Sequence, residues 1–168
     1  MEIRRDSRAI VYNIGLGKSS PLFLLLLTNN YSEFPGGRCN ESETYLDCVI
    51  REASEELRIN KNEFTVVGNG KIFAESSYIY LKNGNEAKVD FQAFPVLMNN
   101  PINIKIGELN KHIEWGWWNL DQTMSSIKFL EQRSTFYQIC EELNKNKHLN
   151  IEEKLLKIYM DYFDFEGY

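Results

Sequence analysis

Cysteine is scarce in this sequence, and its spacing matches no common metal-binding or redox motif. The three cysteines are Cys39, Cys48 and Cys140, and no two of them form a CxxC pair. An odd number of cysteines in a chain without a recognisable signal peptide favours a reducing compartment, so a cytoplasmic location is expected. Cys48 and Cys140 each fall in a predicted helix, where we interpret them as packed thiols rather than as metal ligands.

Long apolar runs are also missing. The apolar run at 22–27 is far shorter than the roughly 20 residues that a membrane-spanning helix needs. It does not follow a charged N-terminal region as the core of a secretory signal would, so we interpret it as a buried strand and expect no membrane partner. Repeats and low-complexity tracts are absent too. At 168 residues, 1–168 is expected to be one domain that buries a substantial core.

Positive charge does not predominate. The chain carries 19 Lys and Arg against 24 Asp and Glu, giving a net charge of −5. This balance argues against a protein that coats nucleic acid through bulk electrostatics. It does not exclude a nucleotide substrate, because a bound metal ion reverses the local charge. Hydrophobic residues make up 43% of the chain, so a folded protein is expected.

Acidic residues are concentrated in one place, where residues 51–56 read REASEE. An α-helix turns once every 3.6 residues, so Glu52, Glu55 and Glu56 fall within about a third of its circumference. Like charges this close repel each other by a few tenths of a kcal/mol per pair. A divalent cation would offset the repulsion, and oxygen-only ligands suit Mg²⁺ or Mn²⁺. Taken alone, such a run is more often a solvated helix face.

The residues around this cluster decide between the two interpretations. They follow the spacing G-x5-E-x7-R-E-U-x-E-E-x-G-U, where U is a bulky aliphatic or small apolar residue, at Gly37, Glu43, Arg51, Glu52, Ala53, Glu55, Glu56 and Ile59. This pattern resembles the Nudix box, the signature of Nudix hydrolases. One position departs, because Arg58 replaces the usual last glycine. That glycine commonly ends the helix with positive φ, which costs another residue roughly 1–2 kcal/mol. Asn60 is expected to take over the cap.

The resemblance implies a fold and a reaction. The fold is an α/β/α sandwich with a central mixed β-sheet and additional C-terminal helices, with the box at 37–59. The reaction is metal-dependent hydrolysis of a diphosphate linkage, in which cations neutralise the phosphate oxygens and activate water. The implied Mg²⁺ (or Mn²⁺) ligands are Glu52, Glu55, Glu56 and the carbonyl of Gly36. Arg51 is expected to orient Glu55 by a charge-assisted hydrogen bond.

The general base is left open by the sequence. In this family it is sometimes a box glutamate and sometimes a glutamate from a later loop, for which Glu108 and Glu114 are candidates. The segment at 111–117, KHIEWGW, resembles the E-H-x-E-x-x-W stretch of several Nudix branches. Lys111 replaces the first acid of that stretch, which favours Glu114 as a catalytic residue. His112 is expected to be structural.

Hydrophobic patterning predicts the remaining elements. Alternation and turn signals predict strands at 9–13, 21–28, 65–67, 71–81, 88–98 and 113–120. A box helix is expected at 43–57, capped by Ser42 or Thr44, and Asp121 is expected to cap a short turn. Two amphipathic segments follow at 127–143 and 151–163. The apolar stripe of the box helix, which should face roughly opposite its glutamates, consists of Leu46, Val49, Ile50, Ala53 and Leu57.

The substrate is less constrained by the sequence than the reaction. Aromatic rings stack on bases, and the candidate substrate-binding residues are Arg38, Tyr78, Tyr80, Phe91, Trp115 and Trp117. The segments 117–123 and 127–133 resemble diadenosine polyphosphate hydrolases, which favours a dinucleoside polyphosphate, a related nucleotide or an RNA 5′ end. Pro35 to Gly37 instead resembles enzymes that cleave nucleoside triphosphates, and the two cues conflict. A nucleoside triphosphate or ADP-ribose pyrophosphatase, or a nucleotide-sensing module without catalysis, are the alternatives. Both a monomer and a homodimer remain open.

Overall fold

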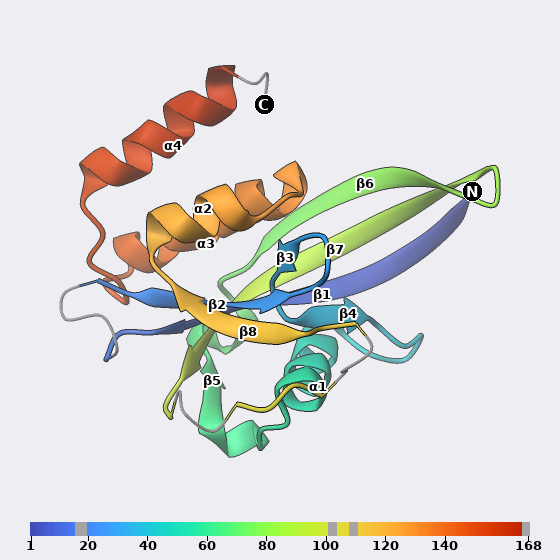
Figure 1. Cartoon of the computed structure of the whole chain (residues 1–168), viewed down its shortest axis with the longest axis horizontal. Coiled ribbons are helices and arrows are strands. Elements are labelled where there is room, and N and C mark those ends of the chain that lie inside the picture. Colours follow the sequence, from blue (N-terminus) through green and yellow to red (C-terminus); the bar gives the residue numbers. More distant parts are fainter. Residues whose placement is uncertain (16–19, 101–103, 108–110, 166–168) are drawn as a thin grey trace.

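A twisted β-sheet lies between two layers of helices in the computed structural model of the protein, which describes residues 1–15, 20–100, 104–107 and 111–165 (Figure 1). The strands are β1 (Glu2–Asn13), β2 (Leu22–Leu27), β3 (Ser32–Glu33), β4 (Gly36–Arg38), β5 (Phe64–Val66), β6 (Ala74–Lys82), β7 (Asn85–Met98) and β8 (Glu114–Trp118). The helices are α1 (Tyr45–Leu57), α2 (Leu120–Ser126), α3 (Leu130–Lys145) and α4 (Glu153–Phe165). Short 3₁₀ turns occur at Lys61–Glu63 and Val67–Gly70.

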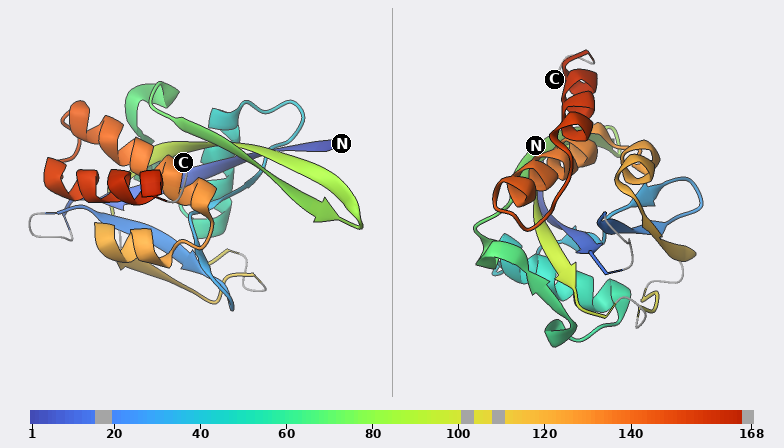
Figure 2. Two further views of the ribbon diagram at one scale, coloured as in Figure 1. Left: turned by 90° about the horizontal axis from the view of Figure 1, so that it is seen from above. Right: turned by 90° about the vertical axis from the view of Figure 1, so that its left-hand side faces the viewer.

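The sheet is mixed, because one central pair of strands is parallel. Its strands follow the order β3-β2-β1-β7-β5, with β4 beside β1, β6 beside β7 and β8 beside β2. The long strands β1 and β7 run parallel, and the other pairs are antiparallel. Figure 2 shows how β1, β6 and β7 extend past the helices at one end of the molecule.

Two hydrophobic cores fill the spaces between the sheet and the helices. Successive side chains of a strand point to opposite faces, so Ile10 of β1 lies in the core beneath α3, whereas Val11 lies in the core beneath α1. The apolar stripe of α1 packs into this second core, as its spacing predicted. The structure therefore has the expected α/β/α sandwich, with α1 on one face and α2, α3 and α4 on the other.

Most predicted elements are present, with shifted boundaries. β1 begins at Glu2 rather than at residue 9, because its N-terminal half pairs with β7. The box helix begins after Thr44, whose hydroxyl accepts the N–H of Asp47. The last predicted strand stops at Trp118, and Asn119 rather than Asp121 caps a helix there, α2. α3 begins at Leu130 instead of residue 127.

The end of the box helix differs from the expectation. Arg58 itself adopts the left-handed conformation at the C-cap, with φ 49° and ψ 48°, and its N–H donates to the carbonyl of Ser54. Asn60 has φ −77° and instead begins the 3₁₀ turn that follows. The prediction that Asn60 takes over the cap is therefore wrong, because the chain accepts the strained residue at the usual position.

Candidate active site

The three box glutamates lie in different environments, although they share one side of α1. The side chain of Glu55 is 61% exposed and that of Glu52 is 12% exposed, whereas Glu56 is buried at 2%. Glu56 therefore points into the protein. The helical pattern alone had indicated the opposite, that Glu56 faces away from the core. Side chains that are equivalent on a helical projection become inequivalent once strand β4 packs against the helix and its Gly36 N–H reaches Glu56.

The Glu56 carboxylate is held against the backbone just before the box. The N–H of Gly36 donates to its Oε2 at 2.8 Å, and Lys111 Nζ lies 3.9 Å from its Oε1. Burial raises the pKa of Glu56 to about 7, against the opposing effects of the Gly36 hydrogen bond and the Lys111 charge. A carboxyl group in this state exchanges its proton near neutral pH and responds strongly to an added cation.

Glycine is required at position 36 by the close approach of β1. Gly36 pairs with Arg8 in the antiparallel ladder between β1 and β4, and its φ is 155°. A Cβ at this position would overlap the carbonyl oxygen of Ser7 and lie 2.9 Å from the Cα of Arg8. The backbone of residue 36 can thus reach Glu56 only because it carries no side chain.

Arg51 connects the remaining box acids. Its guanidinium donates to both carboxylate oxygens of Glu43, at 2.6 and 2.9 Å, and to Glu52 at 2.6 Å. The predicted contact with Glu55 is present at 3.3 Å, and the carbonyl of Arg38 accepts a further bond at 3.0 Å. Hydrogen bonds from Arg51 and from the Asn40 N–H lower the pKa of Glu43 to about 2. Glu43 is thus an ionised anchor that fixes Arg51.

A second group of charges, which the sequence did not reveal, lies beside Glu56. The buried carboxylate of Glu33 contacts Lys111 Nζ and His112 Nε2, each at 2.8 Å, and lies 3.6 Å from Arg8. Burial alone would raise the pKa of Glu33, but the hydrogen bond from His112 and the charges of Arg8 and Lys111 lower it to about 2. Residue 33 lies in a two-residue strand without a periodic pattern, so no sequence signal marks it.

Of the two later candidates for the general base, the structure describes only Glu114. Glu114 is exposed at the start of β8, opposite Leu27. Glu108 lies outside the described residues. From this stretch it is Lys111 that reaches the box, while His112 is fully buried against Glu33. A role for Glu114 stays a prediction.

The aromatic candidates separate into two groups on opposite sides of the sheet. Tyr78 lies 6.3 Å, centroid to centroid, from both Tyr80 and Phe91, on the face of β6 and β7 that α3 covers further along. Trp115 and Trp117 instead pack against the core beneath α1. Burial raises the pKa of the Tyr78 hydroxyl, and the charges of Arg8 and Asp6 act on it too. Arg8, which lies beside Glu33, therefore also acts on the tyrosine group.

Arg38, the remaining substrate-binding candidate, lies at the end of β4. Its side chain is 62% exposed and approaches Glu2 at 3.9 Å. Its backbone carbonyl takes part in holding Arg51. The side chain is therefore accessible to a ligand, while the backbone belongs to the box.

The carboxylates of the box are of the chemical type that binds a hard divalent ion, but in this structure they contact other groups of the protein. Among the described residues, no group of three or more His, Cys, Asp or Glu side chains is arranged to hold a metal ion. Glu52 and Glu55 bind Arg51, and Glu56 binds the Gly36 N–H. The carboxylate of Glu52 also lies directly over Gly37, where a Cβ would overlap it. The candidate ligand atoms, which are the carboxylate oxygens of Glu52, Glu55 and Glu56 and the Gly36 carbonyl, are all oxygens, and this fits Mg²⁺ or Mn²⁺ better than a softer metal.

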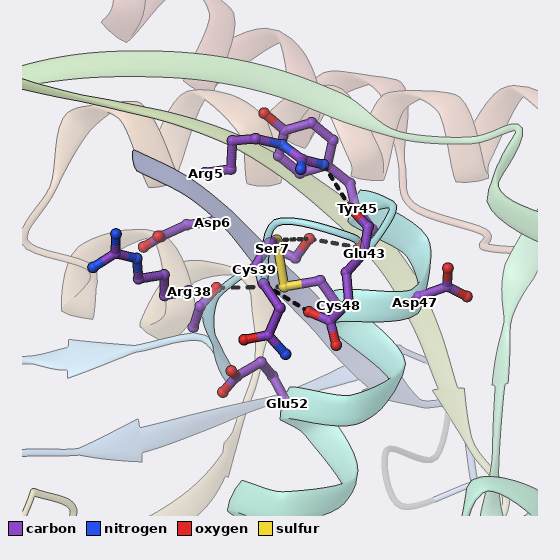
Figure 3. The surroundings of a disulfide bond; sticks show 12 residues. Arg5, Asp6, Ser7, Arg38, Cys39, Glu43, Tyr45, Asp47, Cys48 and Glu52 are labelled. Atoms are coloured by element: carbon purple, nitrogen blue, oxygen red, sulfur yellow. Dashed lines mark hydrogen bonds between the residues drawn. A yellow bond between two sulfur atoms is a disulfide. The ribbon is translucent and has the colours of Figure 1, made fainter. Parts of the chain in front are cut away.

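A disulfide joins Cys39 to Cys48 beside the box (Figure 3), with the two Cα atoms 5.2 Å apart. The interpretation of Cys48 as a packed thiol is therefore wrong, and the argument from an odd cysteine count fails because only Cys140 is left over. Cys140 is a buried thiol, as expected, and burial raises its pKa. A cytoplasmic location stays a prediction. In the described part of the chain, no helix is long and apolar enough to cross a membrane.

Comparison with known proteins gives a match to one protein family. A model of the NUDIX domain matches residues 5–138. Comparison with the sequences of curated proteins gives no match.

Several solved structures share the fold. An Ap4A hydrolase from C. elegans, solved as a binary complex, is 21% identical, with a TM-score of 0.67 over 84% of this chain and 98% of that chain. The dihydroneopterin triphosphate pyrophosphohydrolase of E. coli is 14% identical, with a TM-score of 0.64 over 82% of this chain and 97% of that chain. The Nudix hydrolase RenU from M. smegmatis is 13% identical, with a TM-score of 0.66 over 86% and 89%. At these identities the similarity shows the fold alone.

Proposed function

Because the chain belongs to the NUDIX domain family and is a Nudix hydrolase, an enzyme acting on pyrophosphate bonds, we propose that it cleaves the diphosphate linkage of a nucleoside-diphosphate-linked substrate with the help of Mg²⁺ or Mn²⁺. One observation carries the proposal. The buried carboxylate of Glu56 is bound to the Gly36 N–H, and beside it Arg51 gathers Glu52 and Glu55. Three acids at one place, one of them buried, are costly unless cations compensate them.

Glu52, Glu55, Glu56 and the Gly36 carbonyl are the proposed metal ligands. A metal ion bound there would neutralise charge on the diphosphate and activate a water molecule. Arg51 orients the carboxylates of Glu52 and Glu55, and Glu43 fixes Arg51 in turn. Removal of such outer partners typically costs ten- to a hundredfold in metal affinity.

Two carboxylates are proposed for the general base. Glu114 is the one that the sequence favours, and its exposed position leaves it accessible to water. A box glutamate is the other, and Glu56 is the box glutamate whose pKa burial raises, to about 7 before any metal ion binds. Comparison of the pH profiles of Glu114→Gln and the wild type distinguishes the two.

For the substrate, we propose a dinucleoside polyphosphate or a related nucleotide, including an RNA 5′ end. The sequence likeness at 117–123 and 127–133 supports this choice. The C. elegans structure is an Ap4A hydrolase, but its identity to this chain is too low to transfer a substrate. Nucleoside triphosphates and ADP-ribose are the alternatives within the same reaction class.

A panel of these nucleotides, incubated with Mg²⁺ or Mn²⁺ and analysed for released phosphate and nucleoside phosphates, tests the function. Faster hydrolysis of a dinucleoside polyphosphate than of the other compounds would support the proposed substrate. Tight binding without products would favour the alternative of a nucleotide-sensing module. All box acids are present in this chain, and for that reason catalysis is the function proposed.

Substitution of the box acids gives the sharpest test of the site. Glu55→Gln and Glu56→Gln should lower kcat by orders of magnitude, because each removes a proposed metal ligand. The thermal midpoint should stay unchanged or rise, since repulsion between like charges is relieved. Glu86→Gln, at an exposed position near the start of β7, is a matched control that should keep full activity. Wild-type turnover by both box variants would show that the site is assigned wrongly.

A further inference from the structure

We propose that the Cys39–Cys48 disulfide is a positioning cross-link for the metal-binding face of α1. It holds the loop that carries Glu43, so that Glu43 fixes Arg51 and Arg51 orients the carboxylates. The inference rests on the function proposed above and adds two positioning residues, Cys39 and Cys48, to the same site.

The cross-link closes the loop between β4 and the first turn of α1. Cys39 follows β4 directly, Cys48 lies in the first turn of the helix, and nine positions separate them in the sequence. The two residues are buried, at 8% and 0% exposure. Closing a short loop covalently removes most of the conformations that it could otherwise visit. The segment at 39–48 is therefore held in one arrangement over the helix.

The contacts that fix Arg51 from outside the helix come from this loop and the residue before it. Glu43, near the middle of the loop, accepts two hydrogen bonds from the Arg51 guanidinium. The carbonyl of Arg38, adjacent to Cys39, accepts a third. The Asn40 N–H donates to the Glu43 carboxylate at 2.9 Å, which orients the acceptor itself. Figure 3 shows Glu43, Arg38 and Glu52 grouped around the disulfide.

Arg51 transmits this order to the proposed ligands. Its Nη1 donates to Glu52 at 2.6 Å and to Glu55 at 3.3 Å. An arginine side chain has several rotatable bonds, so it directs two carboxylates reliably only when its own far end is fixed. A continuous path of covalent and hydrogen bonds thus joins the disulfide to the ligand carboxylates.

Other hydrogen bonds hold the same loop to β1, and they predict what happens when the disulfide is lost. Arg5 donates to the Glu43 carbonyl at 2.9 Å, the Ser7 hydroxyl donates to the Tyr45 carbonyl at 2.6 Å, and the Cys39 N–H donates to the Arg5 carbonyl at 2.8 Å. These bonds attach the loop backbone but do not include the Arg51 guanidinium. Loss of the cross-link is therefore expected to loosen the carboxylates more than the fold.

The test compares oxidised and reduced protein in the absence of substrate. Dithiothreitol breaks the S–S bond by delivering two electrons and two protons, which yields two thiols and the cyclic disulfide of the reagent. Mn²⁺ affinity, measured by electron paramagnetic resonance, is expected to be roughly tenfold weaker after reduction, the low end of what losing an outer partner costs. The double variant Cys39→Ser/Cys48→Ser should match the reduced wild type. Mass spectrometry after alkylation of free thiols confirms the redox state.

Two variants separate the positioning role from a general effect of reduction. Glu43→Gln breaks the path beyond the disulfide, so its weakened Mn²⁺ affinity should no longer respond to dithiothreitol. Cys140→Ala removes the remaining thiol, and it should respond as the wild type does.

The outcomes distinguish this inference from the proposed function. Equal Mn²⁺ affinity in both redox states of the wild type overturns the positioning role and leaves the proposed function standing. Unfolding of the reduced protein, seen by circular dichroism, also counts against it, because the cross-link would then serve the fold. Oxidised wild type that binds no Mn²⁺ at all would overturn the proposed function and this inference together.

Discussion

At the scale of single residues, burial gives Glu56 properties that its neighbours on α1 do not share. Its side chain is enclosed beneath Gly36, while Glu55 remains in solvent. Removing a carboxylate from water disfavours its charged form unless cations or donors compensate it. The Gly36 N–H and Lys111 compensate it only in part, which leaves the pKa of Glu56 at about 7. A proton or a metal ion is therefore expected to neutralise the remaining negative charge of the Glu56 carboxylate.

This raised pKa predicts a pH-dependent stability. The pKa of Glu56 rises from 4.5 in the unfolded chain to about 7 in the folded protein, so the folded state holds the proton more tightly. The stabilisation is complete below pH 4.5 and is lost as the pH rises through 7, at up to about 1.4 kcal/mol per pH unit between those values. Urea denaturation of wild type and Glu56→Gln across this range should show the decline only in the wild type. Parallel curves for the two proteins would contradict it.

At the scale of elements, α1 combines a core-packing face with the face that carries the proposed metal ligands, and its end is strained. Arg58 has φ 49° at the C-cap. This left-handed conformation is unfavourable for residues that carry a side chain, although less so for Asn and Asp. Immediately beyond, Lys105 N–H donates to the Leu57 carbonyl and Gly107 N–H to the Glu56 carbonyl. The end of the helix is thus fixed by tertiary contacts, which maintain Arg58 in its unfavourable conformation.

Arg58→Gly is expected to stabilise the protein. Relief of the left-handed strain favours glycine by roughly 1–2 kcal/mol, and the greater freedom of glycine in the unfolded chain offsets about 0.4–1 kcal/mol of that. The free energy of unfolding should therefore rise by about 1 kcal/mol, as measured by chemical denaturation. Activity should not change, because Arg58 is exposed on the surface. A stability equal to or below that of the wild type would show that the Arg58 side chain makes a compensating contact.

At the scale of the whole molecule, the sandwich decides which aromatic rings can serve one substrate. β1 extends along the entire sheet, and Arg8 and Asp6 on its N-terminal half connect the Glu33 group with Tyr78. Trp115 and Trp117 lie on the other side of the sheet, packed against the core beneath α1. A nucleotide base held near the charged groups around Glu33 can therefore contact the tyrosine group, but it cannot also contact Trp115 and Trp117.

Tyr78→Ala is expected to raise KM for the nucleotide substrate by roughly tenfold, since stacking of a base on an aromatic ring contributes about 1–3 kcal/mol. The effect on kcat should be smaller, because Tyr78 does not contact the box acids. Tyr78→Phe keeps the ring and should retain the wild-type KM in steady-state kinetics. Trp117→Phe, on the opposite side, is the matched control. An unchanged KM for Tyr78→Ala would exclude this face as the base site.

Much of the fold and of the candidate site could be predicted because it depends on short-range patterns. The apolar spacing of α1 and the alternation along β7 predicted both elements close to their observed positions. The box spacing located Arg51 and the three glutamates on one helix. Prediction failed where distant segments meet. The pairing of Cys39 with Cys48 does not follow from local sequence, because it depends on how β4 packs on α1. The box pattern located the left-handed cap at position 58, but that Arg58 itself adopts it depends on how the segment at 104–107 packs on α1.

The sequence by itself determined the family, the sandwich fold and the acids from which a metal site is proposed, because periodicity and spacing along one helix are local properties of the chain. Only the tertiary structure decided how those acids differ. Their positions in predicted helices indicated that Cys48 and Cys140 are packed thiols, yet the fold pairs Cys48 with Cys39 beside the box. It also buries Glu56, leaves Glu55 exposed and places Glu33 and Lys111 next to the site. Burial and the charges of distant neighbours set the protonation of a carboxylate, and both exist only once the chain has folded.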